Sequence, residues 1–384
     1  MLDGTAVPTT FVSSRQVTAA IPAADAALAR RYAVYVQNGT AISNVSDLTV
    51  IQPVTVGTSP VGVAVDPYLD QAVVTNSGSN SISVVNLLDG TQITPQAPSF
   101  FTTGAVPQGV AVLALTGQAV VTNNGSNDVT VLDEKGLNNV FNSPQTVTLG
   151  AATLPIGVAI DPYTALAVVT DTTVTGGNPA GAFSTFTVAS QVSGTASLGN
   201  TIDYLPLGLA IDPAINNDIT QSVAGIATAS NRNGLDLVPL PAGAFTNIAM
   251  QLPTGVVFDS LNQIFAVTDS GANNVDLVDP LASKEIYTIS AGINPTSLDY
   301  NFNTSTLVTS NSASNTLSII DYVCPPNPNG VSNCPTPQVR EVLDVDAVSP
   351  VVLGPNALAI DTRLNLAAVI DSANNRILLV PLPH

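Results

Sequence analysis

Six polar side chains recur at one position of a repeated pattern. Seven prolines each precede an apolar run, and in six of the seven repeats the residue sixteen places later is Asn or Asp. These residues are Asn76, Asn123, Asp171, Asp269, Asn311 and Asp371. Carboxylate and amide oxygens are ligands that Ca²⁺ prefers, and carboxylates also bind cationic groups. If these side chains converged at the mouth of a central channel, they would form a ligand or cation site, with Ca²⁺ as the candidate cofactor.

Turn geometry is the competing interpretation of this column, because Asn and Asp favour turns for local reasons. A second column lies six residues after each proline and also looks like a metal ring. Its members are Asp66, Leu113, Asp161, Asp212, Asp259, Asn301 and Asp361. An Asp at a strand end caps the following turn with its own carboxylate. We therefore predict turn caps, one in each hairpin, rather than a calcium ring at this second column.

Common catalytic constellations have no counterpart in the sequence. The single histidine is the terminal His384, so neither a Ser-His-Asp nor a Cys-His arrangement is possible. The sequence also lacks a C-x-x-C-H haem motif and a G-x-x-x-x-G-K-[ST] phosphate loop. These features favour a non-catalytic binding or scaffold module. The alternative is a hydrolase, lyase or lactonase that uses carboxylates and a bound cation at the channel mouth.

The composition limits the partners. Only 9% of residues are charged, and 27 acidic against 9 basic residues give a formal net charge of −18. Nucleic acid is not expected as a partner, because neutralising phosphates requires clustered Lys and Arg. No run of 18 apolar residues exists, so membrane insertion through a helix is not expected. The partner that we expect is a protein or a glycan.

Two cysteines stand in a loop sequence, "CPPNPNGVSNC", as Cys324 and Cys334. A metal site would need further ligands, and a redox dithiol is more often C-x-x-C. We interpret the pair as a disulfide that closes a surface loop, with two free thiols as the alternative. A disulfide indicates an oxidising compartment, so we expect an extracellular or cell-surface protein. The start "MLDGTAVPTT" has no signal-peptide pattern, and we expect that the natural chain begins earlier.

The element that repeats is a short β-sheet. The stretch "GVAVDPYLDQAVVTNSGSNSISVV" returns in variants with steps of 42 to 60 residues. The aligned prolines are Pro60, Pro107, Pro155, Pro206, Pro253, Pro295 and Pro355. Each unit predicts three or four strands separated by Asn/Gly/Ser turns, which is typical of a β-propeller blade. We therefore predict an all-β, seven-bladed propeller over residues 53–384.

The ring must also close. The seventh unit ends in "RILLVPLPH", which supplies a third strand and leaves no residues for a fourth. Residues 54–56, just before the first unit, match the closing "TVTLG" segment of the second unit. We predict that they pair antiparallel with residues 376–380, because closure removes exposed strand edges.

The repeats resemble a known group of bacterial propellers. "VVTNSGSNSISVV" is close to the YVTN repeat signature, and "DSGANNVDLV" and "DSANNRILLV" resemble NHL blades. This resemblance covers residues 53–384 and implies a fold, whereas the motif residues indicate no activity.

Residues 1–52 resemble the second half of an IPT/TIG domain, through "SSRQVTAAIPAAD" and "YAVYVQN". That family has an immunoglobulin-like sandwich and is common in bacterial surface proteins, so the resemblance implies a partial sandwich at the N-terminus. The family's first strands have no counterpart here. A short strand-rich arm packed on the propeller is the alternative.

Overall fold

We analysed a computed structural model of the chain. The residues that it describes are 1–93, 103–133, 144–149, 153–175, 178–188, 197–198, 206–213, 222–229, 233–240, 245–322, 337–345 and 358–383. They form strands and turns, including a 3₁₀ turn at Ser372–Asn374. None of the described segments is a helix with the length and hydrophobicity that a membrane span requires.

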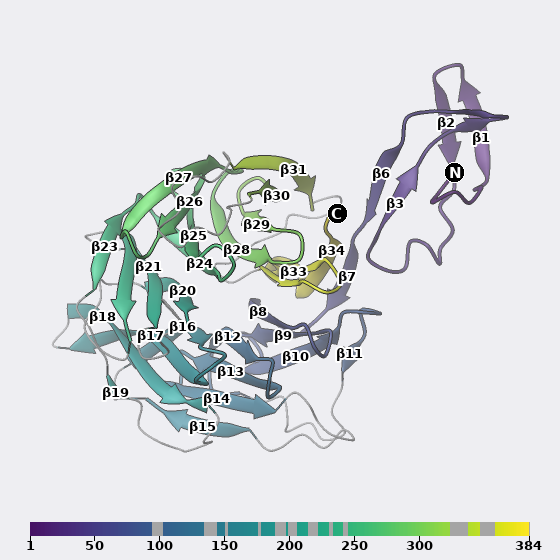
Figure 1. Ribbon diagram of the computed structural model, residues 1–384. Helices are drawn as coiled ribbons and strands as arrows, with labels where there is room; N and C mark the ends of the chain where they lie inside the picture. Colours follow the sequence, from purple (N-terminus) through teal and green to yellow (C-terminus); the bar gives the residue numbers. More distant parts are fainter. Residues whose placement is uncertain are drawn as a thin grey trace.

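Seven four-stranded antiparallel sheets are arranged around a central axis, which confirms the all-β, seven-bladed propeller (Figure 1). The innermost strands are β8 (Pro60–Asp66), β12 (Pro107–Leu113), β16 (Thr153–Ile160), β20 (Pro206–Asp212), β24 (Pro253–Asp259), β28 (Pro295–Asn301) and β32 (Leu358–Asp361). The second strands are β9 (Gln71–Asn76), β13 (Gln118–Asn123), β17 (Leu166–Thr175), β21 (Val223–Thr228), β25 (Ile264–Asp269), β29 (Thr306–Asn311) and β33 (Leu366–Asp371).

The two outer positions of each blade complete the sheet. The third strands are β10 (Ser81–Asn86), β14 (Asp128–Asp133), β18 (Asn178–Thr187), β22 (Gly234–Pro239), β26 (Asn274–Asp279), β30 (Thr316–Asp321) and β34 (Arg376–Pro381). The outer strands are β11 (Gln92–Ile93), β15 (Gln145–Thr148), β19 (Ser197–Leu198), β23 (Thr246–Ala249), β27 (Lys284–Ser290), β31 (Gln338–Asp344) and β7 (Gln52–Thr55). We number the blades one to seven in the order of their innermost strands.

The predicted closure of the ring is confirmed. Strand β7 pairs antiparallel with β34, with Val54 opposite Ile377 and Thr55 opposite Arg376. The pairing of the two strands extends one residue further, through a hydrogen bond of 2.9 Å from the Val56 N–H to the Asn375 carbonyl. Blade seven therefore takes its outer strand from the segment before blade one, and the first and last repeats hold each other in place.

The repeated Gly and Thr of the motif explain how neighbouring blades meet. A Cβ on Gly62 of blade one would lie 2.5 Å from the Gln108 carbonyl oxygen of blade two, so only glycine fits there. The Thr75 hydroxyl donates to that same Gln108 oxygen at 2.7 Å, and Thr122 repeats the contact to Ile156 at 2.8 Å. The Thr of "VVTN" thus joins one blade to the next, which accounts for its recurrence. Apolar side chains fill the space between the sheets, as in the cluster of Leu235, Phe265 and Val267 between blades four and five.

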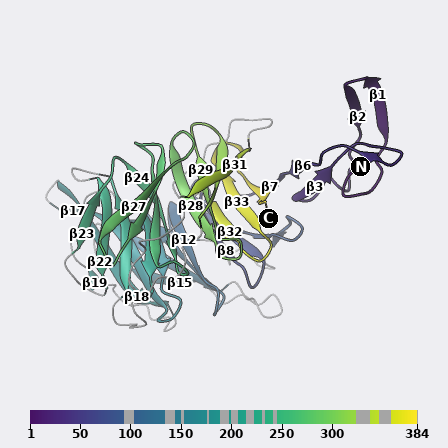
Figure 2. The same cartoon turned by 45° about the horizontal axis from the view of Figure 1, so that its top comes forward.

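The N-terminal segment projects from the propeller beside blade seven (Figures 1 and 2). It forms three two-stranded pairs: β1 (Thr9–Ser13) with β2 (Gln16–Ala19), β3 (Arg30–Val34) with β6 (Ser46–Val50), and β4 (Gln37–Asn38) with β5 (Ala41–Ile42). Most of its side chains are exposed. Arg31 links it to the propeller through Glu341 of β31, with the charged atoms 3.1 Å apart. The resemblance to an IPT/TIG domain stays a prediction.

Candidate functional site

The innermost strands of all seven blades line a central channel with a cavity of about 330 Å³. Its lining is mostly Val, Ile, Leu and Ala. The residues four places after each aligned proline all border it: Ala64, Ala111, Ala159, Ala210, Val257, Asp299 and Ala359. Small residues are needed at this level because the strands converge on the axis. Blade six departs from the pattern by placing a carboxylate in an otherwise apolar column.

Asp299 is fixed in the channel by backbone hydrogen bonds. Its carboxylate accepts the Ile360 N–H of blade seven at 2.7 Å and the Tyr300 N–H at 2.8 Å. Burial raises the pKa of Asp299 to about 6, although these two bonds act in the opposite direction. A carboxyl with such a pKa can accept or donate a proton near neutral pH. Our sequence analysis missed Asp299, although an Asp among Ala and Val in an aligned column was a signal for it.

The column six residues after each proline caps the turn that follows, as predicted. Asp66 Oδ1 accepts the N–H groups of Tyr68 and Leu69 at 2.8 and 3.2 Å. The same pattern is found at Asp161, Asp259, Asn301 and Asp361. The turn after Asp212 continues into residues outside the described ones. The carboxylates of this column are therefore used to hold the hairpins.

These capped turns present large apolar side chains to solvent. The turns after the innermost strands lie at one end of the propeller, where Arg363 of blade seven bonds Asp70 of blade one at 2.8 Å. The turns between the third and fourth strands lie at that end too. Seven large apolar side chains of these turns are at least half exposed: Tyr68, Leu88, Leu115, Tyr163, Leu261, Leu281 and Phe302. We call this set the apolar end. It also escaped the sequence analysis, which treated "DPY" only as a turn.

The six predicted ligand residues lie at the opposite end, because the second strand runs antiparallel to the first. All six are buried. The three asparagines each donate a hydrogen bond to a hydroxyl of the third strand in their own blade. The bonds run from Asn76 to Ser83 at 3.1 Å, from Asn123 to Thr130 at 2.8 Å, and from Asn311 to Ser318 at 2.9 Å.

Two of the three aspartates also bond within their own blades, and Asp269 bonds to the segment that joins blade four to blade five. Asp171 accepts the Ser184 hydroxyl at 2.6 Å, and burial raises the pKa of Asp171 to about 7. Asp371 accepts the Arg376 Nε–H at 2.6 Å. Asp269 accepts backbone N–H groups, among them those of Gln251 at 2.7 Å and Leu252 at 2.8 Å.

Each of the six residues makes hydrogen bonds to residues outside this set. Across the described ranges, no hydrogen bond joins any two of them. Within the same part of the chain, no group of three or more His, Cys, Asp and Glu side chains is placed to hold a metal ion. A ligand or cation role for the six stays a prediction. So does the disulfide, since Cys324 and Cys334 lie outside the described residues.

Comparison with known proteins identifies the fold. The chain is similar to hydrazine synthase from Kuenenia stuttgartiensis, with a TM-score of 0.64 and 16% identity over 85% of this chain and 97% of that one. It is also similar to a streptogramin B lyase, with a TM-score of 0.60 and 11% identity over 87% of this chain and 97% of that one. Virginiamycin B lyase from Staphylococcus aureus gives a TM-score of 0.58 and 12% identity, over 87% and 99% of the two chains. No protein-family model and no curated protein sequence matches the chain.

Proposed function

We propose that this protein is a non-catalytic binding module that docks a protein partner on the apolar end of its propeller. The observation that carries this proposal is the set of seven large apolar side chains exposed at that end. Exposed apolar groups gathered on one surface are typical of interaction sites. The neighbouring turns come from five different blades, so the apolar end surrounds the mouth of the channel.

The rigidity of the turns supports a docking function. Tyr68 and Tyr163 follow the buried turn caps Asp66 and Asp161, whose carboxylates fix the backbone of each hairpin. Side chains held in this way lose little conformational freedom on binding. Tyrosine and phenylalanine are enriched at the centres of protein interfaces, and the leucines beside them favour a protein over a glycan as the partner.

The cellular location is part of the proposal. The resemblance to YVTN/NHL-like propellers and to IPT/TIG domains supports a secreted or cell-surface bacterial protein. The predicted disulfide of Cys324 and Cys334 supports the same location.

The experiment compares wild type with a Tyr68→Ser/Tyr163→Ser double variant. Each purified protein is immobilised and exposed to secreted and surface proteins of the source organism, and any captured protein is then purified and titrated. We expect the double variant to bind it at least thirtyfold more weakly, since losing an aromatic hot spot costs about 2 kcal/mol. Ile293→Ser, at the opposite end, is the control because Ile293 is also exposed. Equal binding by the double variant, or saturable binding of a glycan alone, would overturn the proposal.

A hydrolase, lyase or lactonase acting in the channel is the second candidate, and Asp299 is the observation that favours it. Its carboxyl, with a pKa of about 6, borders the apolar cavity. Two of the similar structures are named as lyases, so elimination substrates would be tried first. Turnover that Asp299→Asn abolishes and EDTA reduces would support a mechanism that uses a carboxylate with a bound cation such as Ca²⁺. Turnover unaffected by Asp299→Asn would exclude it.

A further inference from the structure

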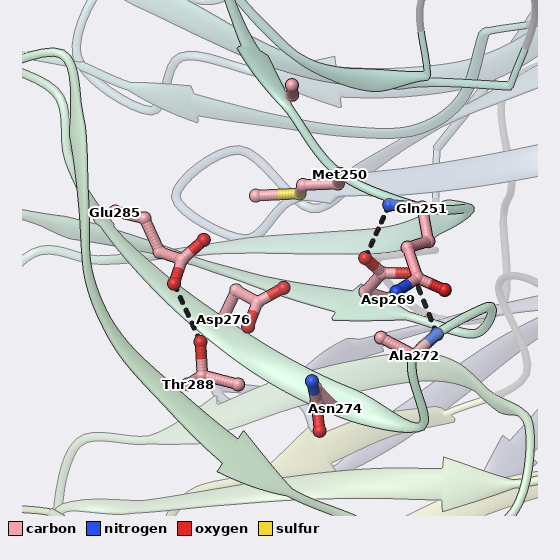
Figure 3. Close-up of a pocket in the computed structure, with 9 residues that line it drawn as sticks. Met250, Gln251, Asp269, Ala272, Asn274, Asp276, Glu285 and Thr288 are labelled. Carbon is pink, nitrogen blue, oxygen red and sulfur yellow. Dashed lines mark hydrogen bonds between the residues drawn. The ribbon is translucent and has the colours of Figure 1, made fainter.

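A second pocket is lined by residues of blades four and five (Figure 3). It has a volume of about 290 Å³. Blade five contributes three carboxylates, Asp269, Asp276 and Glu285, and blade four contributes Ala249 and Met250. No Lys or Arg is among the described residues that line it. The pocket is therefore strongly acidic along one side and apolar along the other.

Comparison with other blades shows what is unusual about the pair Asp269 and Asp276. In blades one, two and six, the corresponding second-strand residue is an Asn that donates to a Ser or Thr hydroxyl of the third strand. In blade three, the Ser184 hydroxyl donates to Asp171. Each of these pairs joins a donor to an acceptor. Blade five instead places two carboxylates at the two positions, and neither can donate when both are ionised.

The unmet acceptor is on Asp276. This residue is only 4% exposed, and its Oδ1 atom is buried without a hydrogen-bond partner. Thr288 stands opposite Asp276 on the neighbouring strand β27, but its hydroxyl donates its single hydrogen to Glu285 at 2.6 Å. Asp269 is occupied by backbone N–H groups. Burying a carboxylate oxygen without a donor is unfavourable, so the arrangement indicates that a ligand supplies the missing positive charge.

We infer that this pocket binds a primary ammonium group carried on a short alkyl chain. An ammonium group has three N–H donors, which suit the Asp276 Oδ1 atom and the neighbouring Glu285 and Asp269 carboxylates. The alkyl chain would lie against Ala249 and Met250. The apolar wall and the volume suit an organic cation better than a bare metal ion. A lysine side chain of another protein and a free diamine share this chemistry.

The protonation state of Asp276 provides an independent readout. Burial and the negative charges of Glu285 and Asp269 raise the pKa of Asp276 to about 7, against the lowering effect of Thr288. The groups facing it from blade four, Ala249, Met250 and Gln251, do not titrate. Ammonium binding needs the ionised carboxylate, so affinity should be about tenfold weaker at pH 6 than at pH 8.

Calorimetric titration of the full chain tests the inference with two probes, 1,4-diaminobutane and Nα-acetyl-lysine methylamide. We expect saturable binding to wild type at pH 8 and at least tenfold weaker binding to Asp276→Ser. Serine is the residue that blades one and six have at this position. Asp89→Asn is the control, since it removes one exposed negative charge elsewhere. Tighter binding of the lysine analogue assigns a protein side chain, and tighter binding of the diamine assigns a free amine.

Three results would overturn the inference. They are no saturable binding of either amine at millimolar concentration, equal binding to a folded Asp276→Ser variant, and binding of Ca²⁺ but not of the amines. The residues that line this pocket include none of the seven side chains of the apolar end, so these results leave the proposed docking function untouched.

Discussion

Blades four and five carry an aspartate at the same position of the third strand, but its hydrogen-bond partners differ between the two blades. Asp236 of β22 and Asp276 of β26 are both buried on the third strand. Opposite Asp236, Asn247 of β23 donates its Nδ2–H at 2.7 Å. Opposite Asp276 stands Thr288, whose hydrogen goes to Glu285 instead. The comparison shows that the fold accepts a carboxylate here when a donor faces it, and that without the donor the carboxylate faces a pocket.

The largest effect should come from removing the donor in blade four. Asn247→Ala leaves a buried Asp236 oxygen without that partner, and an unsatisfied buried acceptor costs about 1–3 kcal/mol. We expect the free energy of unfolding to fall by that amount in urea denaturation. Thr246→Ala, an exposed neighbour on the same strand, is the control. If both variants unfolded alike, the bond in blade four would not be what distinguishes the two blades.

A gain in stability is expected when the carboxylate of blade five is removed. Asp276→Ser takes away a buried charge that lies near Asp269 and Glu285, and supplies the hydroxyl found in other blades. At pH 8 and without ligand, the variant should be more stable than wild type by about 1 kcal/mol. The melting temperature would show this directly. A lower melting temperature for the variant would mean that Asp276 is already stabilised without a ligand.

The features that recur in every blade could be predicted from the sequence. Proline spacing and alternating apolar residues predicted the seven blades, and the match of residues 54–56 to "TVTLG" predicted the closing strand. These features depend on backbone pairing and burial, which every blade repeats. The turn caps were predictable for the same reason, because an Asp at a strand end bonds only to its own turn.

The candidate sites were harder to predict because they lie where the repeat is broken. Asp299 stands where five other blades have Ala, and Asp276 stands where four other blades have Ser or Thr. A search for recurring residues passes over such departures. The six recurring Asn and Asp residues attracted attention instead. The structure shows five of them bonded within their own blades and Asp269 bonded to the segment that joins blade four to blade five. Whether a recurring polar residue faces its own blade or a shared space depends on packing, which one sequence does not display.

Two buried aspartates should make the stability of the protein depend on pH. The pKa values of Asp276 and Asp171 are raised to about 7, above the usual value of 3.8, so the folded state binds their protons more tightly than the unfolded state. The stability from these protons is present below pH 4 and is lost as pH rises to about 7. We expect the melting temperature of the wild type to fall between pH 5 and pH 8. Asp89→Asn, which removes an exposed charge, is the control and should show the same fall. In Asp276→Ser the fall should be smaller, and an unchanged fall would remove Asp276 as its source.

The smallest effect, and the most specific, should come from giving blade five the donor of blade four. Thr288→Asn places an amide opposite Asp276, as Asn247 stands opposite Asp236. An amide bond to the Oδ1 atom should stabilise the protein at pH 8 by a few tenths to about 1 kcal/mol. It should also weaken ammonium binding severalfold, because the amide occupies the same acceptor. Both effects should vanish in the Asp276→Ser background, since the acceptor is then gone. If Thr288→Asn stabilised both backgrounds equally, the gain would come from elsewhere on the strand, and the two blades would differ for a reason other than the missing donor.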